Sequence, residues 1–307
     1  VTLEDGLAKE YNVKDAILVL FQGVAGDEGN AVFHSAYDIT TSMQLEGTTT
    51  DQITSTTKLV KQVNKGGDAN KLEPSYNTLY ALVILNNNGK FEVTTDHDLQ
   101  YESVDNVDGT VATSSFTGKT FSDFQTLKAK GGYKSFYGDD TKGILMMNAP
   151  LYNKAATTST PPSDLATLAV VTDKVKNTET AAQNEPGAEV FVERAVAKVT
   201  MDNTIPEPKK LTGTEYDVAH SNQVGVELVA WGLDYTNNIS YYMHNAKPSD
   251  AGATDWAKYN KNGDATTTNY RFAGTTEVKS GCGYRAYWGE DPNYAAEPET
   301  DITTGSP

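Results

Sequence analysis

The stretch that decides the fold lies at residues 188–201 and reads AEVFVERAVAKVTM. It is rich in Val and Ala, contains neither Gly nor Pro, and follows the turn-forming sequence Glu185-Pro186-Gly187. Its length is about twice that of a typical β-strand. The pattern therefore predicts one long strand, or a strand that leaves one sheet and enters another.

Alternation along this stretch predicts that both of its faces are apolar and buried, because successive strand residues point to opposite faces. One face would carry Val190, Val192 and Val196, and the other Phe191, Ala195, Ala197 and Val199. The stretch lies about two thirds of the way along the chain. We therefore expect a domain junction here, made by Phe191, Arg194, Val196 and Val199.

Length and composition predict a mainly β protein. A chain of 307 residues can bury a sizeable core and favours two domains over one. Hydrophobic residues make up only 38%, but 9 Phe, 17 Tyr and many Val and Thr are spread along the chain. Such residues favour β-sheet over disorder. We expect a mainly β fold with one or two short helices.

The charge balance excludes some classes of partner. The chain has 25 Lys and Arg against 41 Asp and Glu, a formal net charge of −16. Nucleic-acid binding needs a basic face, so no nucleic-acid partner is expected, and an anionic membrane surface is disfavoured. Only three of the basic residues are Arg. An Arg-specific protease would therefore find few sites.

Cysteine content and hydropathy add further limits. The one cysteine, Cys282, cannot form an internal disulfide, and we expect it to be a small buried residue rather than a nucleophile. No run reaches the roughly 18 apolar residues of a membrane-spanning helix. The sequence starts at Val1 without a basic and apolar leader, so we expect Val1 to be a processed N-terminus.

Five apolar runs have the length and composition of strands, at 14–21, 79–85, 143–150, 165–172 and 224–233. The first is expected to form a hairpin with residues 31–37. The loop at 26–30 reads as a turn rather than a calcium site, because it lacks alternating Asp and Asn ligands. A short aromatic strand is expected at 239–243.

Residues 120–129 carry the best helix pattern in the chain. Thr120 can cap the helix, and Phe121, Phe124 and Leu127 recur at helical spacing. The apolar face of this helix is therefore expected to dock on a sheet.

Signatures of catalysis are absent from the sequence. It contains no phosphate-binding Gly-rich loop, no GxSxG elbow and no HExxH or CxxC pair. The four His residues lie far apart, and Asp96-His97-Asp98 would present its ligands to opposite faces of a strand. A glycoside hydrolase needs only two carboxylates, so acid pairs leave that class open. We predict no enzyme activity, no cofactor and no metal site.

Several segments, in order, resemble the fimbrillins, the shaft subunits of Bacteroidales surface fimbriae (type V pili). The segment FVERAVAKV at 191–199 carries the resemblance most clearly. Residues 14–21 are similar to the family's first mature strand, and residues 79–89 to its LVVxANxG strand. Residues 118–124 resemble its GKTLxE helix start, and residues 143–150 its MxxxP strand. Residues 231–233 and 284–294 resemble second-domain segments of the longer members.

The resemblance implies two transthyretin-like β-sandwich domains, at 1–187 and 188–307, the second incomplete at its C-terminus. It implies a lipoprotein precursor that is exported to the outer membrane and cut after an Arg, which makes Val1 the protease-generated N-terminus. Removal of the first strand opens an apolar groove, which a neighbour's C-terminal strand fills. We assign that donor-strand groove to Ile17, Val19 and Phe21 of one strand and Leu82 and Ile84 of the next.

The function implied is that of a shaft subunit in an adhesive fimbrium that supports biofilm formation and virulence. Its partners would be identical subunits in a head-to-tail polymer, accessory, anchor or tip subunits, and host or bacterial surface ligands. The sequence ends before any apolar terminal strand, so we expect the chain to continue past Pro307. A fimbrial tip or accessory adhesin, binding through Trp and Tyr residues, is the alternative, and a surface glycan hydrolase is a third class.

Overall fold

The computed structural model describes residues 13–46, 56–59, 75–104, 111–137, 143–153, 165–171, 178–184, 188–196, 239–246, 258–260, 268–270, 273–278, 280–281 and 283–286. Internal contacts divide the chain into two units, Val1–Val196 with Asn238–Pro307, and Ala197–Asn237. All described residues belong to the first unit. The strand expected at 224–233, together with Val1, Val199 and Cys282, lies outside the described residues.

The described part of the chain is mainly β, as the composition predicted. Its strands pair antiparallel throughout. The elements are β1 (Ala16–Gly23), β2 (Val32–Asp38), β3 (Met43–Glu46), β4 (Thr56–Leu59), β5 (Thr78–Leu85), β6 (Phe91–Val93), β7 (Leu99–Ser103), β8 (Ala112–Ser115), α1 (Phe121–Gln125), β9 (Lys128–Lys130), β10 (Met146–Asn148), β11 (Leu151–Tyr152), β12 (Ala169–Val170), α2 (Glu179–Asn184), β13 (Val192–Arg194), β14 (Ile239–Tyr241), β15 (Lys258–Asn260), β16 (Thr268–Tyr270), β17 (Ala273–Glu277) and β18 (Tyr284–Ala286), with 3₁₀ helices at Thr40–Ser42 and Gly132–Ser135.

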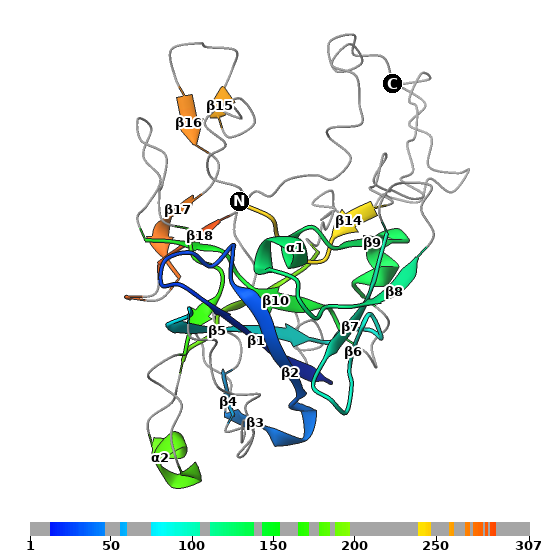
Figure 1. The fold of residues 1–307 in the computed structure, drawn as a ribbon. Coiled ribbons are helices and arrows are strands. Elements are labelled where there is room, and N and C mark those ends of the chain that lie inside the picture. The colour runs from blue at the N-terminus through cyan, green and yellow to red at the C-terminus, as the bar shows by residue number, and fades with distance from the viewer. Residues whose placement is uncertain are drawn as a thin grey trace, which may run out of the picture. The chain divides into compact units, whose positions relative to one another are not determined.

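The largest sheet is built around β1 and β5 (Figure 1). Its strand order is β13-β10-β5-β1-β2, and β12 also pairs with β5. The β1–β5 ladder runs from Ala16 opposite Leu85 to Gly23 opposite Thr78. Residues of β1 alternate between two apolar clusters, with Val19 in one and Leu20 in the other. The strand predicted at 14–21 is therefore confirmed as β1, which is buried apart from the half-buried Leu18.

The predicted first hairpin is also confirmed, and its second strand is covered along its outer edge. β2 pairs with β1 across a bulge between Leu20 and Phe21. The Phe33 N–H donates to the Lys119 carbonyl at 2.8 Å, and the Ala36 N–H donates to the His97 carbonyl at 2.8 Å. These contacts satisfy backbone groups that an edge strand would otherwise expose.

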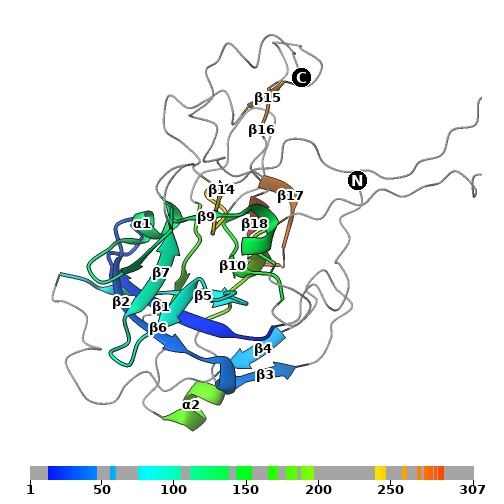
Figure 2. The ribbon, with the colours of Figure 1, turned by 90° about the vertical axis from the view of Figure 1, so that its right-hand side faces the viewer.

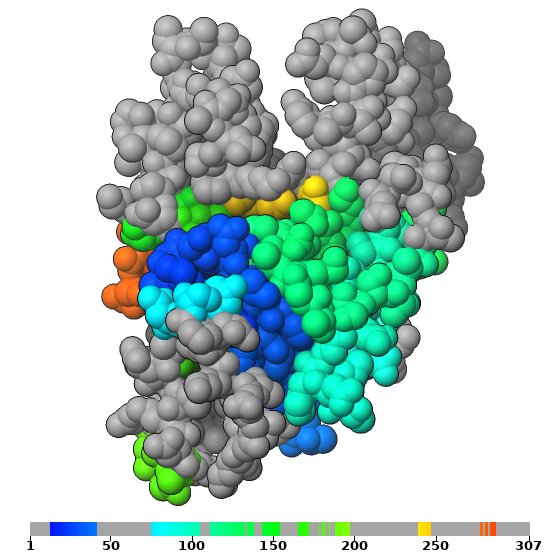
Figure 3. Space-filling model, in the orientation of Figure 1, coloured from blue at the N-terminus to red at the C-terminus, as the bar shows by residue number. Residues whose placement is uncertain are grey.

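A second layer, formed by β6, β7, β8 and α1, packs on the hairpin side of this sheet. β7 is the central strand of the three-stranded sheet β6-β7-β8. Figure 2 shows β6 and β7 over β1 and β2, in keeping with the contacts between β2 and β6. In Figure 3 the blue residues of the hairpin lie against green residues of 111–137, where Val32 and Thr120 form an isolated bridge.

The helix predicted at 120–129 is shorter than expected. Thr120 caps it as predicted, accepting a hydrogen bond from the Asp123 N–H while the Asp123 carboxylate accepts one from the Thr120 N–H. Thr126 is its C-cap, where the backbone N–H and the hydroxyl both donate to the Asp123 carbonyl, at 3.2 and 2.7 Å. Leu127 is buried but follows the helix, and β9 begins at Lys128.

In its described part, the stretch at 188–201 forms a short strand at one end of the large sheet, not a long one. Only Val192–Arg194 is β-strand, paired with β10. Val192 packs against one apolar cluster, whereas Ala195 and Val196 both pack against the other. The expected alternation thus fails at Val196, because the chain bends after Arg194.

Strands on both sides of residue 187 pair with one another. β13, β14 and β18 follow that residue, and they pair with β10, β9 and β11, which precede it. The division into domains 1–187 and 188–307 stays a prediction. The shorter predicted strands at 143–150, 165–172 and 239–243 correspond to β10, β12 and β14.

Candidate functional site

The structure brings the five predicted groove residues together on one face of the large sheet. Residues directly opposite in a ladder share a face. All five are at most 4% exposed and belong to one core cluster. The facing pairs are Ile17 with Ile84, Val19 with Leu82, and Phe21 with Tyr80. Side chains of the same chain cover them here, and cover by a neighbour's strand stays a prediction.

Phenylalanine rings form the centre of that cover. The rings of Phe33, Phe116, Phe121 and Phe124 lie 5.6 to 6.4 Å from the ring of Phe21, centroid to centroid, at interplanar angles of 73° to 85°. Such edge-to-face contacts are favourable beyond simple burial. Because Phe121 and Phe124 belong to α1, the apolar face predicted for this helix does dock on the sheet.

A strand from late in the chain closes the same core beside β9. Within β14, Ile239 lies opposite Lys130 and Tyr241 opposite Lys128. The pairing continues past the strand, since the Tyr242 N–H donates to the Leu127 carbonyl at 3.1 Å.

Three side chains in β14 and directly after it are almost wholly buried. Ile239, Tyr242 and Met243 are each 2% exposed. The Tyr242 ring lies 5.1 Å from the ring of Phe91 and 6.1 Å from that of Phe136. Burial raises the pKa of the Tyr242 hydroxyl, and the negative charge of Glu102 adds to that rise. Residues 239–246 are therefore an integral part of the core, which otherwise consists mainly of residues between 17 and 168.

A carboxylate on β13 joins three segments that are far apart in the sequence. Glu193 Oε1 lies 2.6 Å from His244 Nδ1, and Glu193 Oε2 accepts from Arg285 Nε at 3.2 Å. The Glu193 side chain is 8% exposed, His244 19% and Arg285 44%. A carboxylate this shielded is strongly destabilising unless it is paired. We call Glu193, His244 and Arg285 the β13 latch.

The β13 latch lies at the margin of the main core. Glu193 is opposite Met147 across the β10–β13 ladder, and Met147 belongs to the main core cluster. His244 directly follows Met243 of the same cluster. The latch therefore connects the large sheet to the segment that closes it.

Asn148 fills a break in the strand that borders β5. β10 pairs with the end of β5 at Leu85, and β12 pairs with it further along at Ala81. Between them, Asn148 Oδ1 accepts from the Val83 N–H at 2.9 Å, while its Nδ2 donates to the carbonyls of Ala81 and Thr167 at 3.0 and 2.9 Å. One side chain thus supplies the hydrogen bonds that a continuous strand would make.

Glu28, in the loop between β1 and β2, is a second buried carboxylate. It accepts hydrogen bonds from the backbone N–H groups of Thr167 at 3.0 Å and Leu168 at 2.9 Å. Desolvation raises its pKa, and the hydrogen bonds from Leu168 and Thr167 oppose that rise. The loop read as a plain turn therefore also anchors the residues leading into β12.

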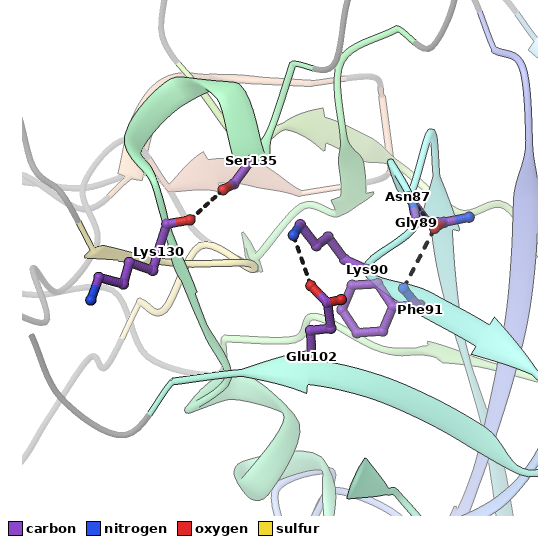
Figure 4. A network of polar contacts seen from close by, with 7 residues as sticks. All are labelled: Asn87, Gly89, Lys90, Phe91, Glu102, Lys130 and Ser135. Atoms are coloured by element: carbon purple, nitrogen blue, oxygen red, sulfur yellow. Dashed lines mark hydrogen bonds and ion pairs between the residues drawn. The ribbon is translucent and has the colours of Figure 1, made fainter. Parts of the chain in front are cut away.

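A polar network lies beside the core at the turn that follows β5 (Figure 4). Asn87 Oδ1 accepts from the Gly89 N–H at 2.7 Å, and Asn86 and Asn88 adopt positive φ angles of 55° and 54°. Asparagine tolerates this region better than most residues, which agrees with the sharp reversal read from NNNG. The Lys90 ammonium then pairs with the Glu102 carboxylate at 2.8 Å, joining β6 to β7.

Three of the four predicted junction residues are described. Arg194 lies opposite Met146 of β10, the Phe191 carbonyl accepts from the Ala149 N–H, and Val196 follows the bend. Their role as a domain junction stays a prediction. In the described residues no group of three or more His, Cys, Asp and Glu side chains is placed to hold a metal ion. Among the helices that the structure describes, none is long and apolar enough to cross a membrane.

Comparison with protein families, curated proteins and solved structures gave no match.

Sequence reasoning missed the β13 latch, Asn148 and the anchoring role of Glu28. One signal was present: Glu193 interrupts an apolar run, and an acid in a buried strand must find partners. Asn148 likewise follows two methionines in a core strand. Their partners lie far away in the sequence, and no local pattern identifies them.

Proposed function

We propose that this chain is a shaft subunit of a surface fibre of the fimbrillin type, which polymerises when a strand of one copy completes the core of the next. The role is structural and not enzymatic. The proposal includes two transthyretin-like β-sandwich domains, export as a lipoprotein precursor and a final location in a fimbrium anchored at the outer membrane. Its partners are identical subunits, accessory subunits and surface ligands.

The observation that carries this proposal is the dependence of the core on a late strand. Phe91 and Phe136 pack on Tyr242, which follows β14, and residues 239–246 form part of the cover over the face that holds Val19 and Leu82. Donor-strand assembly uses a core that one separate strand completes. The added strand supplies hydrogen bonds to exposed backbone groups and covers exposed apolar side chains.

The form of the large sheet supports the same proposal. β13 is the last strand at one end of the sheet, and Val190, Phe191 and Val192 are half-buried there. Half-exposed apolar residues on an end strand favour pairing between chains. The resemblance of FVERAVAKV and the other ordered segments to the fimbrillins points to the same class.

The test is assembly of the mature protein with its natural termini. We expect a ladder of oligomers on a denaturing gel when samples are not boiled, collapse of the ladder to monomer on boiling, and fibres by negative-stain electron microscopy. A sample unfolded in guanidinium and then boiled is the control for covalent products. A protein that stays monomeric at every concentration and temperature contradicts the shaft role.

The same preparation distinguishes the shaft role from the alternative roles. A monomer that binds host or bacterial surfaces without assembling would support a fimbrial tip or accessory adhesin instead. Release of product from a panel of labelled glycans would support the hydrolase class.

A further inference from the structure

The turn that follows β5 contains an Asn-Gly sequence, Asn88–Gly89, one of two in the chain. Asparagine before glycine is prone to spontaneous deamidation, because glycine has no side chain to hinder the approach of its backbone nitrogen to the asparagine amide. The other such sequence, Asn262–Gly263, lies outside the described residues. At Asn88 the contacts of the folded turn decide how fast the reaction runs.

Deamidation begins with an attack by the Gly89 backbone nitrogen on Cγ of Asn88. The nitrogen loses its proton to hydroxide, the N–Cγ bond forms, and the Cγ–Nδ2 bond breaks as ammonia leaves with a proton from water. Water then opens the cyclic imide at either carbonyl. The products are aspartate, with an unchanged backbone, and isoaspartate, whose backbone passes through the former side chain. No group is oxidised or reduced.

The nitrogen that must attack is held by Asn87. The Gly89 N–H donates to Asn87 Oδ1 at 2.7 Å (Figure 4). Asn87 is itself fixed by Asp15, because its N–H and its Nδ2 both donate to Asp15 Oδ1 at 2.8 Å. The proton that the reaction removes is therefore engaged in a short hydrogen bond to an anchored side chain.

The amide of Asn88 is also held in an unreactive setting. Its Nδ2 donates to the Phe136 carbonyl at 3.1 Å, and its Oδ1 is buried with no donor among the described residues. The reversed amide would place two carbonyl oxygens together, so the network fixes this orientation. Attack on Cγ puts negative charge on Oδ1, and such charge needs hydrogen-bond donors. The described surroundings of Oδ1 supply none.

Asn86 closes the turn from two sides. Its Oδ1 accepts from the Lys14 N–H at 2.7 Å, and its Nδ2 donates to the Ile144 carbonyl at 2.9 Å. The residue is 0% exposed. The turn is thus tied to the segments that lead into β1 and β10. Opening it requires the loss of several buried hydrogen bonds, so local opening is rarer here than in a solvent-exposed loop.

We propose that Asn88 is a latent deamidation site that the folded turn keeps intact, with Asn87 as the protecting residue. Once the turn opens, the reaction proceeds and its product prevents the original turn from re-forming. Aspartate at position 88 cannot donate to the Phe136 carbonyl and brings a negative charge beside it. Isoaspartate lengthens the backbone between β5 and β6. Deamidation therefore converts a transient opening of this turn into a permanent one.

Peptide mapping by mass spectrometry measures the reaction at Asn88 in the full chain. The protein is kept in mildly alkaline buffer, sampled over weeks and digested, and the aspartate and isoaspartate forms of the Asn88 peptide are quantified. The same protein unfolded in guanidinium gives the rate without the turn. We expect the folded protein to react at Asn88 about tenfold more slowly or less, because at least two hydrogen bonds must break first.

Variants of Asn87 test which contact protects Asn88. Asn87→Ala should raise the rate at Asn88 in the folded protein by about fivefold or more, the factor expected for loss of one hydrogen bond. Asn87→Ser should restore much of the protection, because a serine hydroxyl accepts from the N–H two residues on. Phe21→Leu, which loosens the core but leaves these contacts in place, is the control and should leave the rate near that of the unmodified protein.

Equal rates at Asn88 in the folded and unfolded protein overturn the proposal, and this comparison decides even if Asn87→Ala does not fold. An increase in Phe21→Leu as large as in Asn87→Ala also overturns it, because protection would then come from global stability. The consequence for the turn is tested with Asn88→Asp. This variant should unfold at a lower urea midpoint than the unmodified protein, and an unchanged midpoint would show that the product leaves the turn closed.

Discussion

Asn148, the last residue of β10, accepts a hydrogen bond at 2.9 Å from the backbone N–H of Val83 in β5, between the places where β10 and β12 border the same side of β5. β10 ends at Asn148, and β12 lies further along. The side chain is 2% exposed and makes two further bonds to backbone carbonyls. Continuity of the central sheet therefore depends on one polar residue in the core.

Replacing Asn148 with Ala should destabilise the protein by about 3 kcal/mol. The change leaves the Val83 N–H and two carbonyls buried without these partners, and an unsatisfied buried group costs roughly 1–3 kcal/mol. Urea unfolding followed by circular dichroism measures the loss as a lower midpoint at constant slope. Asn184→Ala, at an exposed position of α2, is the matched control and should stay within about 0.5 kcal/mol of the unmodified protein. Equal midpoints for the two variants would contradict the role of Asn148.

Glu28 should make the protein less stable as pH rises above about 4.5. Burial raises the pKa of this carboxyl above its ordinary value of 4.5. Between the two values the folded state binds more protons than the unfolded state, so the free energy of unfolding falls as pH increases through this window. Glu28→Gln removes the titration. The stability of this variant relative to the unmodified protein should therefore increase from pH 4.5 to pH 7.

Thermal unfolding at several pH values checks the Glu28 prediction. Val24→Ala, in the same loop and 47% exposed, is the control, because a change between two uncharged side chains should give a difference that does not vary with pH. The stability of Glu28→Gln relative to the unmodified protein should rise with pH. If it stays constant or falls, desolvation does not dominate the pKa of this carboxyl.

The Glu193–His244 pair should be coupled more strongly than the Lys90–Glu102 pair. The Glu193 side chain is 8% exposed, whereas Lys90 and Glu102 are 25% and 33% exposed. Double-mutant cycles with Ala should give a coupling above about 1 kcal/mol for the first pair and about 0.2–1 kcal/mol for the second. Raising the salt concentration should weaken the Lys90 pair more, because solvent screens it more fully. A larger coupling at Lys90 would reverse this ranking.

Phe21 should be among the most costly core residues to truncate. Its ring contacts four other phenylalanines, and it is 0% exposed. Phe21→Ala should cost about 3–5 kcal/mol through lost burial and the cavity left behind. If that variant does not fold, Phe21→Leu should still fold with a smaller loss. Guanidinium unfolding of both variants, with Val24→Ala as the exposed control, measures the loss of unfolding free energy for each and so ranks them. A loss at Phe21 no larger than at Val24 would contradict the central place of this ring.

Local patterns predicted the centre of the sheet well. The apolar runs at 14–21 and 79–85 became β1 and β5, and alternation placed Ile17, Val19, Leu82 and Ile84 on a shared face. Thr120 and the spacing of Phe121 and Phe124 identified the start and face of α1. These features depend on neighbours only a few residues away, so the sequence carries them directly.

The lengths of the strands and the helix, and the pairing of the strands, were predicted less well, because they depend on distant residues. The apolar content of 188–201 suited a long strand, but its described part forms β13 for only three residues and then bends. The helix after Thr120 gave way to β9 because Lys128–Lys130 pairs with β14, more than a hundred residues later. Nothing local identifies His244 and Arg285 as partners of Glu193.

The position of β14 in the chain affects how the protein is made. During synthesis, residues up to Val196 emerge with Phe91 and Phe136 lacking the side chain of Tyr242, since that residue is translated later. Pairings between strands so distant in sequence give a high contact order, which slows folding. A nascent chain therefore passes through a stage with its aromatic core uncovered, when aggregation competes with folding. Such a chain would benefit from a chaperone that shields this surface until residue 246 has emerged.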